Sequence, residues 1–188
     1  LGAALCEAAF LTGVEKNADV VVLASYAPLF ARLGYAQWTP DMIWFNDAEC
    51  FPSPSFLVQK MYSRNMGDYV VENNLDDELF LADSRYKNIF HTVSYDTAEN
   101  ELIVKLVNPW DFDCVVTVDM DGFKPDYGKV HCIIMGEAEN EVYNNVNCQD
   151  NVKAYEFNIE AAFDGKVPDI GKFSLRAHTF SIFRIRCS

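Results

Sequence analysis

The chain has 188 residues, of which 50% are hydrophobic and 23% are charged, a composition typical of a folded globular protein. Its 28 acidic residues outnumber the 15 Lys and Arg residues and give a formal net charge of -13. This balance argues against a nucleic-acid partner and against an anionic membrane surface, because both are bound mainly through cations. The longest uncharged run, residues 20–31, is too short to cross a membrane.

The start of the chain does not read as a signal peptide. Glu7, Glu15 and Lys16 interrupt its apolar residues, and no basic region precedes them. The chain also lacks an initiator Met and opens within a helical pattern. We therefore expect it to be the C-terminal piece of a longer protein.

The cysteines and histidines do not indicate a metal site or a cofactor. The six cysteines are Cys6, Cys50, Cys114, Cys132, Cys148 and Cys187. None of them forms a CxxC pair, and the three histidines do not complete a zinc spacing. Cys114 and Cys132 lie in apolar strand patterns, where a buried free thiol is the commoner case. Disulfide pairing and redox compartment stay open at this point.

The first part of the chain is predicted to be helical. Residues 1–16 are rich in good helix formers, with a packing face of Leu5, Ala8, Ala9 and Thr12 at helical spacing. Asn17 can end this helix. We expect a second helix from residue 20 to Pro28, although the β-branched run at its start equally suits a strand.

A strand, a loop and a helix follow. Residues 41–46 are apolar at consecutive positions, as in a parallel strand that is covered on both faces. After a loop at residues 47–54, Ser53 or Ser55 can cap a helix whose first position suits Pro54. This is the unit from which α/β barrels are built.

From residue 68 the period changes to that of strands. Residues 89–95 and 102–108 flank the turn DTAEN and predict an antiparallel hairpin. Further strands are predicted at residues 68–72, 112–120, 129–136, 154–159, 172–177 and 181–187, with a polar loop at 137–151. Many short strands with turns between them indicate an antiparallel sandwich. We place the boundary between the two architectures near residue 66.

The segments LGAALCEAAFLTGVEKN, DVVVLASYAPLF, WTPDMIWFN and PSFLVQKMYS, in this order, resemble the C-terminal region of the α-L-arabinofuranosidases of glycoside hydrolase family 51. The final KFSLRAHTFSIFRIR resembles the closing strand of that family. The resemblance implies the last helices and last strand of a (β/α)8 barrel over residues 1–66, with residues 41–46 as strand eight. It implies a jelly-roll-like β-sandwich over residues 67–188.

The resemblance also implies a function. The family hydrolyses terminal α-L-arabinofuranosyl residues with retention, using one glutamate as acid/base and a second as nucleophile. Both glutamates are expected upstream of residue 1, so we assign no catalytic residue here, and Glu7 and Glu15 read as solvated or helix-end charges. The implied partner is an arabinose-containing polysaccharide or oligosaccharide. The family often forms homo-oligomers, and we lean towards a secreted or extracellular protein.

The contribution expected of this chain is a wall of the sugar pocket. Barrel active sites lie at the C-terminal ends of the strands, which here means the residues after Phe45. Asn46 and Glu49 are our candidates for contact with sugar hydroxyls, although the family's Gln-containing loop is replaced by DAECFPS. A solvent-exposed loop or a helix-capping carboxylate is the plain alternative. Trp44 reads as core, and Trp38 and Trp110 stay open between packing and sugar stacking.

Two other functions remain open from sequence. The sandwich could be a carbohydrate-binding or structural module of another glycosidase. The chain could also come from a different retaining glycosidase on the same architecture, such as a xylosidase, because the fold alone does not fix the substrate.

Overall fold

The computed structural model describes residues 1–75, 89–118, 122–136, 141–158 and 171–188. The helices in these ranges are α1 (Gly2–Lys16) and α2 (Pro54–Arg64). The strands are β1 (Phe30–Arg32), β2 (Ile43–Phe45), β3 (Cys50–Pro52), β4 (Tyr69–Val70), β5 (Phe90–Asp96), β6 (Glu101–Asn108), β7 (Cys114–Thr117), β8 (Pro125–Gly136), β9 (Ala154–Asn158), β10 (Lys172–Leu175) and β11 (Thr179–Cys187).

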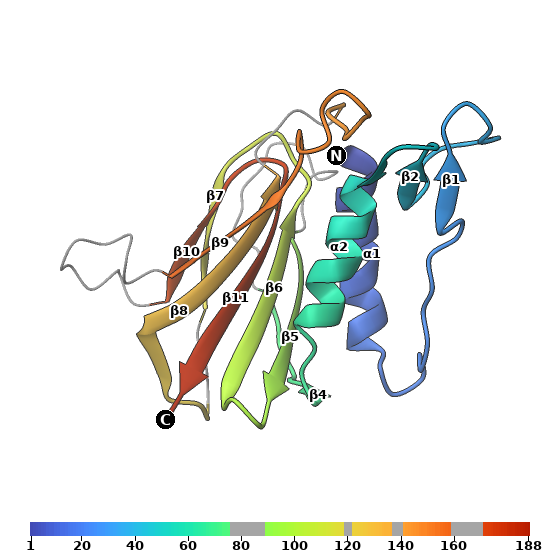
Figure 1. Ribbon diagram of the computed structural model, residues 1–188. Coiled ribbons are helices and arrows are strands. Elements are labelled where there is room, and N and C mark those ends of the chain that lie inside the picture. The colour runs from blue at the N-terminus through green and yellow to red at the C-terminus, as the bar shows by residue number, and fades with distance from the viewer. Residues whose placement is uncertain (76–88, 119–121, 137–140, 159–170) are drawn as a thin grey trace.

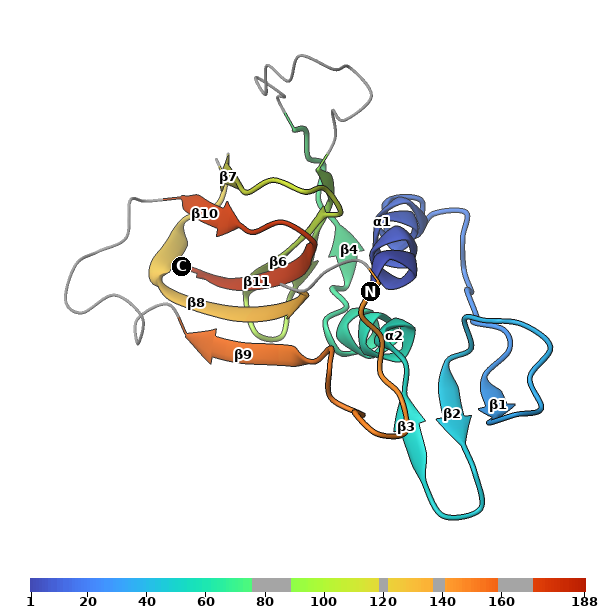
Figure 2. The same ribbon diagram turned by 90° about the horizontal axis from the view of Figure 1, so that it is seen from above.

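The elements are arranged in layers, which Figure 1 and Figure 2 show from two directions. A six-stranded antiparallel sheet has the order β4-β5-β6-β11-β8-β9. Helices α1 and α2 lie against one face of it, and the two-stranded sheet β10-β7 lies over the other. The three-stranded sheet β1-β2-β3 lies beyond the helices. The expected antiparallel sandwich is confirmed by this pair of sheets.

Helix α1 forms as predicted. Its buried side includes Leu5, Ala8 and Thr12, and Ala9 is partly buried at the edge of the same face. Asn17 is the C-cap, and its side-chain Nδ2 donates to the Gly13 carbonyl at 2.7 Å. The helical spacing of small residues thus allows close packing of α1 on the layer below.

The predicted second helix, from residue 20 to Pro28, is wrong. The chain turns at residues 17–20 and then runs without regular structure to β1. Val22 and Leu23 are 92% and 84% exposed, so a helix here would bury no apolar face. The β-branched residues lower the helix propensity and Pro28 cannot continue a helix, so nothing offsets the cost of ordering one.

The strand, loop and helix around residue 50 are confirmed, with one addition. Strand β2 lies within the predicted residues 41–46 and pairs in parallel with β1. The predicted loop contains β3, which pairs with β2 in antiparallel fashion and was not expected. Ser53 is the N-cap of α2, its Oγ accepting from the Phe56 amide at 3.4 Å, and Pro54 occupies the first turn.

The strands of the sandwich agree with their predicted positions. The β5–β6 hairpin runs in register from Phe90 opposite Val107 to Asp96 opposite Glu101. Strand β7 is shorter than the predicted strand at residues 112–120, and β8 begins earlier, at Pro125. Residues 119–120, residues 137–140 of the predicted polar loop, and Ile159 lie outside the described residues.

The central strands of the six-stranded sheet are buried on both faces. On β6, Ile103 and Val107 face the helices, whereas Val104 and Leu106 face the two-stranded sheet. Consecutive positions of this strand are therefore apolar, which is the pattern of a strand that is covered on both sides. Helices and sheet share a single hydrophobic cluster, so α1 and α2 pack on the sandwich as part of its core.

A lysine interrupts the apolar contact between the helices and the sheet. The Lys105 side chain on β6 is fully buried and forms an ion pair with Glu15 of α1. Its Nζ lies 5.2 Å from the centre of the Tyr62 ring of α2. Burial lowers the pKa of Lys105, and the Glu15 charge opposes that change. Glu15 lies at the end of α1, as one of its two expected readings had it, but it is not solvated, because its side chain is only 17% exposed and neutralises a buried cation.

We expect Glu15→Gln to destabilise the protein strongly, because it leaves the Lys105 ammonium buried without a counter-charge. Breaking a buried pair in this way costs about 3 kcal/mol or more. The measurement is urea unfolding at neutral pH. Asp126→Asn is the matched control, since it breaks the exposed Lys129–Asp126 pair at 3.5 Å. That change should cost less than about 1 kcal/mol, and equal losses in the two variants would contradict the assignment.

The six cysteines are free thiols in two classes. Cys6, Cys50 and Cys148 are exposed, and Cys114, Cys132 and Cys187 are buried. Burial raises the pKa of the Cys132 thiol to about 12. Because the thiolate is the reactive form, buried thiols of raised pKa react slowly.

We therefore expect iodoacetamide to label three cysteines of the folded 188-residue chain at mildly alkaline pH. Peptide mass mapping should find the label on Cys6, Cys50 and Cys148. Unfolding in urea should make Cys114, Cys132 and Cys187 reactive as well. Rapid labelling of Cys132 in the folded chain would show that the packing of the sheet core is wrong.

Candidate functional site

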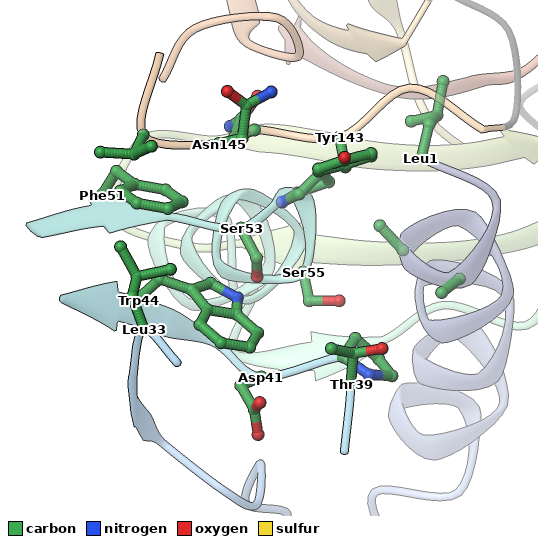
Figure 3. Close-up of a pocket in the computed structure, with 16 residues that line it drawn as sticks. Leu1, Leu33, Thr39, Asp41, Trp44, Phe51, Ser53, Ser55, Tyr143 and Asn145 are labelled. Carbon is green, nitrogen blue, oxygen red and sulfur yellow. The ribbon is translucent and has the colours of Figure 1, made fainter. Parts of the chain in front are cut away.

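A pocket of about 540 Å³ lies where the N-terminal ends of α1 and α2 meet β2, β3 and the loop at residues 143–146. Figure 3 shows the side chains that surround it. They are Leu1, Ala3, Ala4, Leu33, Thr39, Pro40, Asp41, Trp44, Phe51, Ser53, Pro54, Ser55, Tyr143, Asn144, Asn145 and Val146. Its volume is in the range of sites that hold small ligands.

The pocket wall is mainly apolar. Leu1 and Phe51 are buried, and Trp44 is half-buried on β2 with its indole in the wall. Trp44 was expected to be core, and it is both packed and part of the pocket surface. Trp38, which stayed open in the sequence, is 66% exposed and does not line this pocket.

Several polar groups of the pocket are occupied by structural hydrogen bonds. The Ser53 hydroxyl caps α2. The Asn144 side chain donates to the Pro52 and Val152 carbonyls at 3.1 Å each and accepts from the Val152 amide at 2.8 Å. Asn144 therefore connects its loop to the end of β3 through hydrogen bonds, and few of its donor and acceptor positions remain for a ligand.

Asp41 differs from these groups. It stands just before β2, is 1% exposed, and neither of its carboxylate oxygens has a hydrogen-bond partner within the described part of the chain. It is also the one acidic residue among the described residues that line the pocket. A retaining glycosidase needs a pair of carboxylates, and the described lining of this pocket supplies one.

The two residues predicted from sequence to contact sugar lie outside the pocket. Asn46 and Glu49 are in the connection between β2 and β3, and neither lines the pocket. The Asn46 Oδ1 accepts from the amides of Ala48 and Glu49 at 2.8 Å each, and the Asn46 amide donates to the Glu49 carbonyl at 2.9 Å. Asn46 thus holds a tight turn, while the Glu49 side chain is exposed at its tip.

The remaining acidic residues near the site have structural partners. Asp47 forms an exposed ion pair with Arg32 at 2.6 Å. Glu7 on α1 accepts a hydrogen bond from Gln59 on α2, and burial raises the pKa of Glu7 while that bond opposes the change. Within the described ranges, no group of three or more His, Cys, Asp or Glu side chains could hold a metal ion. Nor does any helix in those ranges have the length and apolar character to span a membrane.

Sequence reasoning did not identify the pocket. Strand β3 and the loop at residues 143–146 form much of its wall, and neither carried a pattern that placed it beside α1. Asp41 gave a weak signal, as a carboxylate at the start of an apolar strand. Its lack of a partner follows only from the packing around it.

Comparison with known proteins identifies the family. Residues 1–174 match the family model described as the α-L-arabinofuranosidase C-terminal domain. The chain belongs to this family. The match confirms the resemblance to the C-terminal region of these enzymes that the four N-terminal segments carried.

Several relatives of this domain are also named as arabinofuranosidases. The α-L-arabinofuranosidase A of Aspergillus niger is 32% identical over 84% of the chain and 23% of its own length. The extracellular exo-α-L-arabinofuranosidase of Streptomyces chartreusis is 57% identical over 36% of the chain and 8% of its own length. The chain therefore spans less than a quarter of these relatives.

Solved structures show the same fold. An arabinose-bound GH51 α-L-arabinofuranosidase, MgGH51, aligns with a TM-score of 0.81 at 21% identity, covering 98% of the chain and 27% of that structure. The GH51 α-L-arabinofuranosidase of Thermotoga petrophila RKU-1 aligns with a TM-score of 0.75 at 13% identity, covering 96% and 37%. The β-sandwich of the chain thus matches the C-terminal part of these enzymes.

Proposed function

We propose that the chain is the C-terminal part of a retaining α-L-arabinofuranosidase, which removes terminal α-L-arabinofuranosyl residues from arabinose-containing polysaccharides or oligosaccharides. The match of residues 1–174 to the C-terminal domain of that family carries the proposal. The catalytic glutamates belong to the part of the enzyme that precedes this chain. The pocket agrees with this division of roles, since Asp41 alone cannot supply the two carboxylates.

Residues 1–66 are proposed to be the end of the catalytic (β/α)8 barrel, and residues 67–188 the sandwich. The parallel pair β1–β2 and the two helices support the barrel part. Phe10, Val22, Leu23 and Phe30 are large apolar residues and are all at least 60% exposed. The rest of the barrel would cover them and would provide strand partners for the free edge of β1.

A secreted or extracellular location is part of the proposal, supported by the name of the Streptomyces chartreusis relative. A homo-oligomer is proposed as well, and light scattering of the whole enzyme tests it.

The whole enzyme should hydrolyse p-nitrophenyl α-L-arabinofuranoside, and the 188-residue chain should not. The reason is that the bond-breaking carboxylates are expected upstream of Leu1. Proton NMR of the first product should show the α-anomer, as retention requires. Hydrolysis of the matching β-D-xylopyranoside instead would favour a xylosidase. Retention of the isolated chain on insoluble arabinoxylan, with no activity in the whole protein, would favour a carbohydrate-binding module.

Asn46 and Glu49 remain our candidates for contact with the sugar, because they follow the C-terminal end of β2, where barrel enzymes bind substrate. In the whole enzyme, Glu49→Ala and Asn46→Ala should raise KM or lower kcat by several-fold. Glu49→Ala is the cleaner variant, since the Asn46 oxygen also holds the turn. Glu99→Ala, on an exposed sandwich turn, is the control, and kinetics like those of the control in both variants would contradict the assignment.

A further inference from the structure

Three aromatic rings meet at one end of the six-stranded sheet. Tyr69 of β4 lies opposite Tyr95 of β5, and their ring centroids are 5.5 Å apart. Phe123, which precedes β8, contacts the Tyr95 ring with a centroid distance of 5.5 Å as well. Tyr69 is 52% exposed, and the other two residues are half-buried. The rings therefore form an aromatic surface that solvent reaches, at the end of the sheet where the β5–β6 hairpin turns (Figure 1).

The backbone holds Tyr69 against Tyr95. Gly67 runs so close to β5 that a Cβ atom there would lie 2.7 Å from both the Ser94 Cβ and the Tyr95 nitrogen. The Asp68 amide donates to the Tyr95 carbonyl at 2.7 Å. The rings are consequently in position before a ligand arrives, which lowers the entropy cost of binding.

An exposed carboxylate is fixed beside the rings. The Asp68 Oδ2 accepts from the Thr97 amide at 2.7 Å and from the Thr97 hydroxyl. These bonds hold the pKa of Asp68 below its ordinary value, so the carboxylate is charged at neutral pH. Thr97 takes two of the roughly four acceptor positions of the carboxylate, which leaves others for a ligand. The aromatic surface thus has a hydrogen-bond acceptor of defined orientation at its edge.

This arrangement suits a neutral sugar. The C–H groups on one face of a sugar ring pack on the negative face of an aromatic ring, and the hydroxyls on its rim donate to a carboxylate. A phosphorylated or sulfated ligand is disfavoured, because the Asp68 carboxylate and the net charge of -13 repel anions. The proposed substrate of the enzyme, an arabinose-containing glycan, is a ligand of the neutral kind.

We propose that the aromatic surface of Tyr69, Tyr95 and Phe123, together with the Asp68 carboxylate, binds a stretch of arabinose-containing polysaccharide. The inference deepens the proposed function and rests on it for the identity of the glycan. A polymer that binds here and is cleaved by the same molecule is held at two points, so its apparent affinity exceeds that of a short substrate. An aryl arabinofuranoside reaches only the point of cleavage and gains nothing from the aromatic surface.

Kinetics of the whole enzyme on two substrates test this proposal. Tyr69→Ala should raise KM for soluble arabinoxylan several-fold and leave kcat/KM for p-nitrophenyl α-L-arabinofuranoside unchanged. Tyr155→Ala is the matched control, because Tyr155 is 54% exposed on β9, the opposite edge strand of the same sheet. This control should behave like the wild type with both substrates. Equal KM values of the two variants for the polymer, or a loss of the same size on both substrates in Tyr69→Ala, would overturn the proposal.

Affinity electrophoresis of the whole protein gives a readout that does not require hydrolysis. A gel that contains arabinoxylan should retard the wild type relative to a gel without polysaccharide, and it should retard Tyr69→Ala and Asp68→Ala less. Glu99→Ala, on the same hairpin turn as Thr97, should be retarded like the wild type. Full retardation of Tyr69→Ala and Asp68→Ala would overturn the proposal. Retardation that depends on Tyr69 in a protein that hydrolyses no arabinofuranoside would support the aromatic surface and contradict the proposed function, so the two failures are distinguishable.

Discussion

The structure depends on the burial of one sheet from both sides. Strands β6, β8 and β11 are its centre, and they pack against α1 and α2 on one face and against β7 and β10 on the other. A strand that is covered on both sides has no face for solvated polar residues, and β6 is accordingly apolar at nearly all consecutive positions. The helices are consequently as necessary to the sandwich as its second sheet. They cover one hydrophobic face of the six-stranded sheet, and β7 and β10 cover the other.

Double burial also explains the charged and polar groups inside the protein. Lys105 faces the helices and is neutralised by Glu15, and the ring of Tyr62 covers its ammonium. Tyr62 itself stacks on Phe180 at a centroid distance of 5.0 Å and donates from its hydroxyl to the Ala8 carbonyl at 2.8 Å. A buried pair of this kind contributes little net stability compared with an apolar substitute, yet it penalises any other register of α1 on the sheet.

The part of the chain around β1 and β2 is packed less completely than the sheet. Among the described residues, it is the part richest in exposed apolar side chains, and Asp41, beside β2, is a buried carboxylate without a partner in those ranges. A buried carboxylate without a partner lowers the stability of a folded protein, and a large exposed apolar surface usually marks a binding interface. Both features are accounted for by the proposal that the rest of a catalytic barrel covers this side.

The sequence by itself determined the elements whose pattern is local. It predicted α1 from helical spacing, the Ser53 cap and Pro54 start of α2, and the hairpin around residues 97–100. The sequence also indicated the family. Each of the segments that resemble it is a common helix or strand pattern, but their order along the chain is specific. These features depend on neighbours within a few residues of each other, so they can be read without knowing the fold.

The tertiary structure alone decided the features that depend on distant neighbours. Val20 to Leu23 has the composition of a helix or a strand, and neither forms, because nothing in the described part of the chain covers it. The fold also places Glu15 beside Lys105 of β6, a distant residue in the sequence, in a buried ion pair. It also brought Leu1, Asp41 and Asn144, which are far apart in sequence, to one pocket. The local sequence pattern limits which secondary structures a segment can form, and the residues that bury the segment decide which of them it adopts.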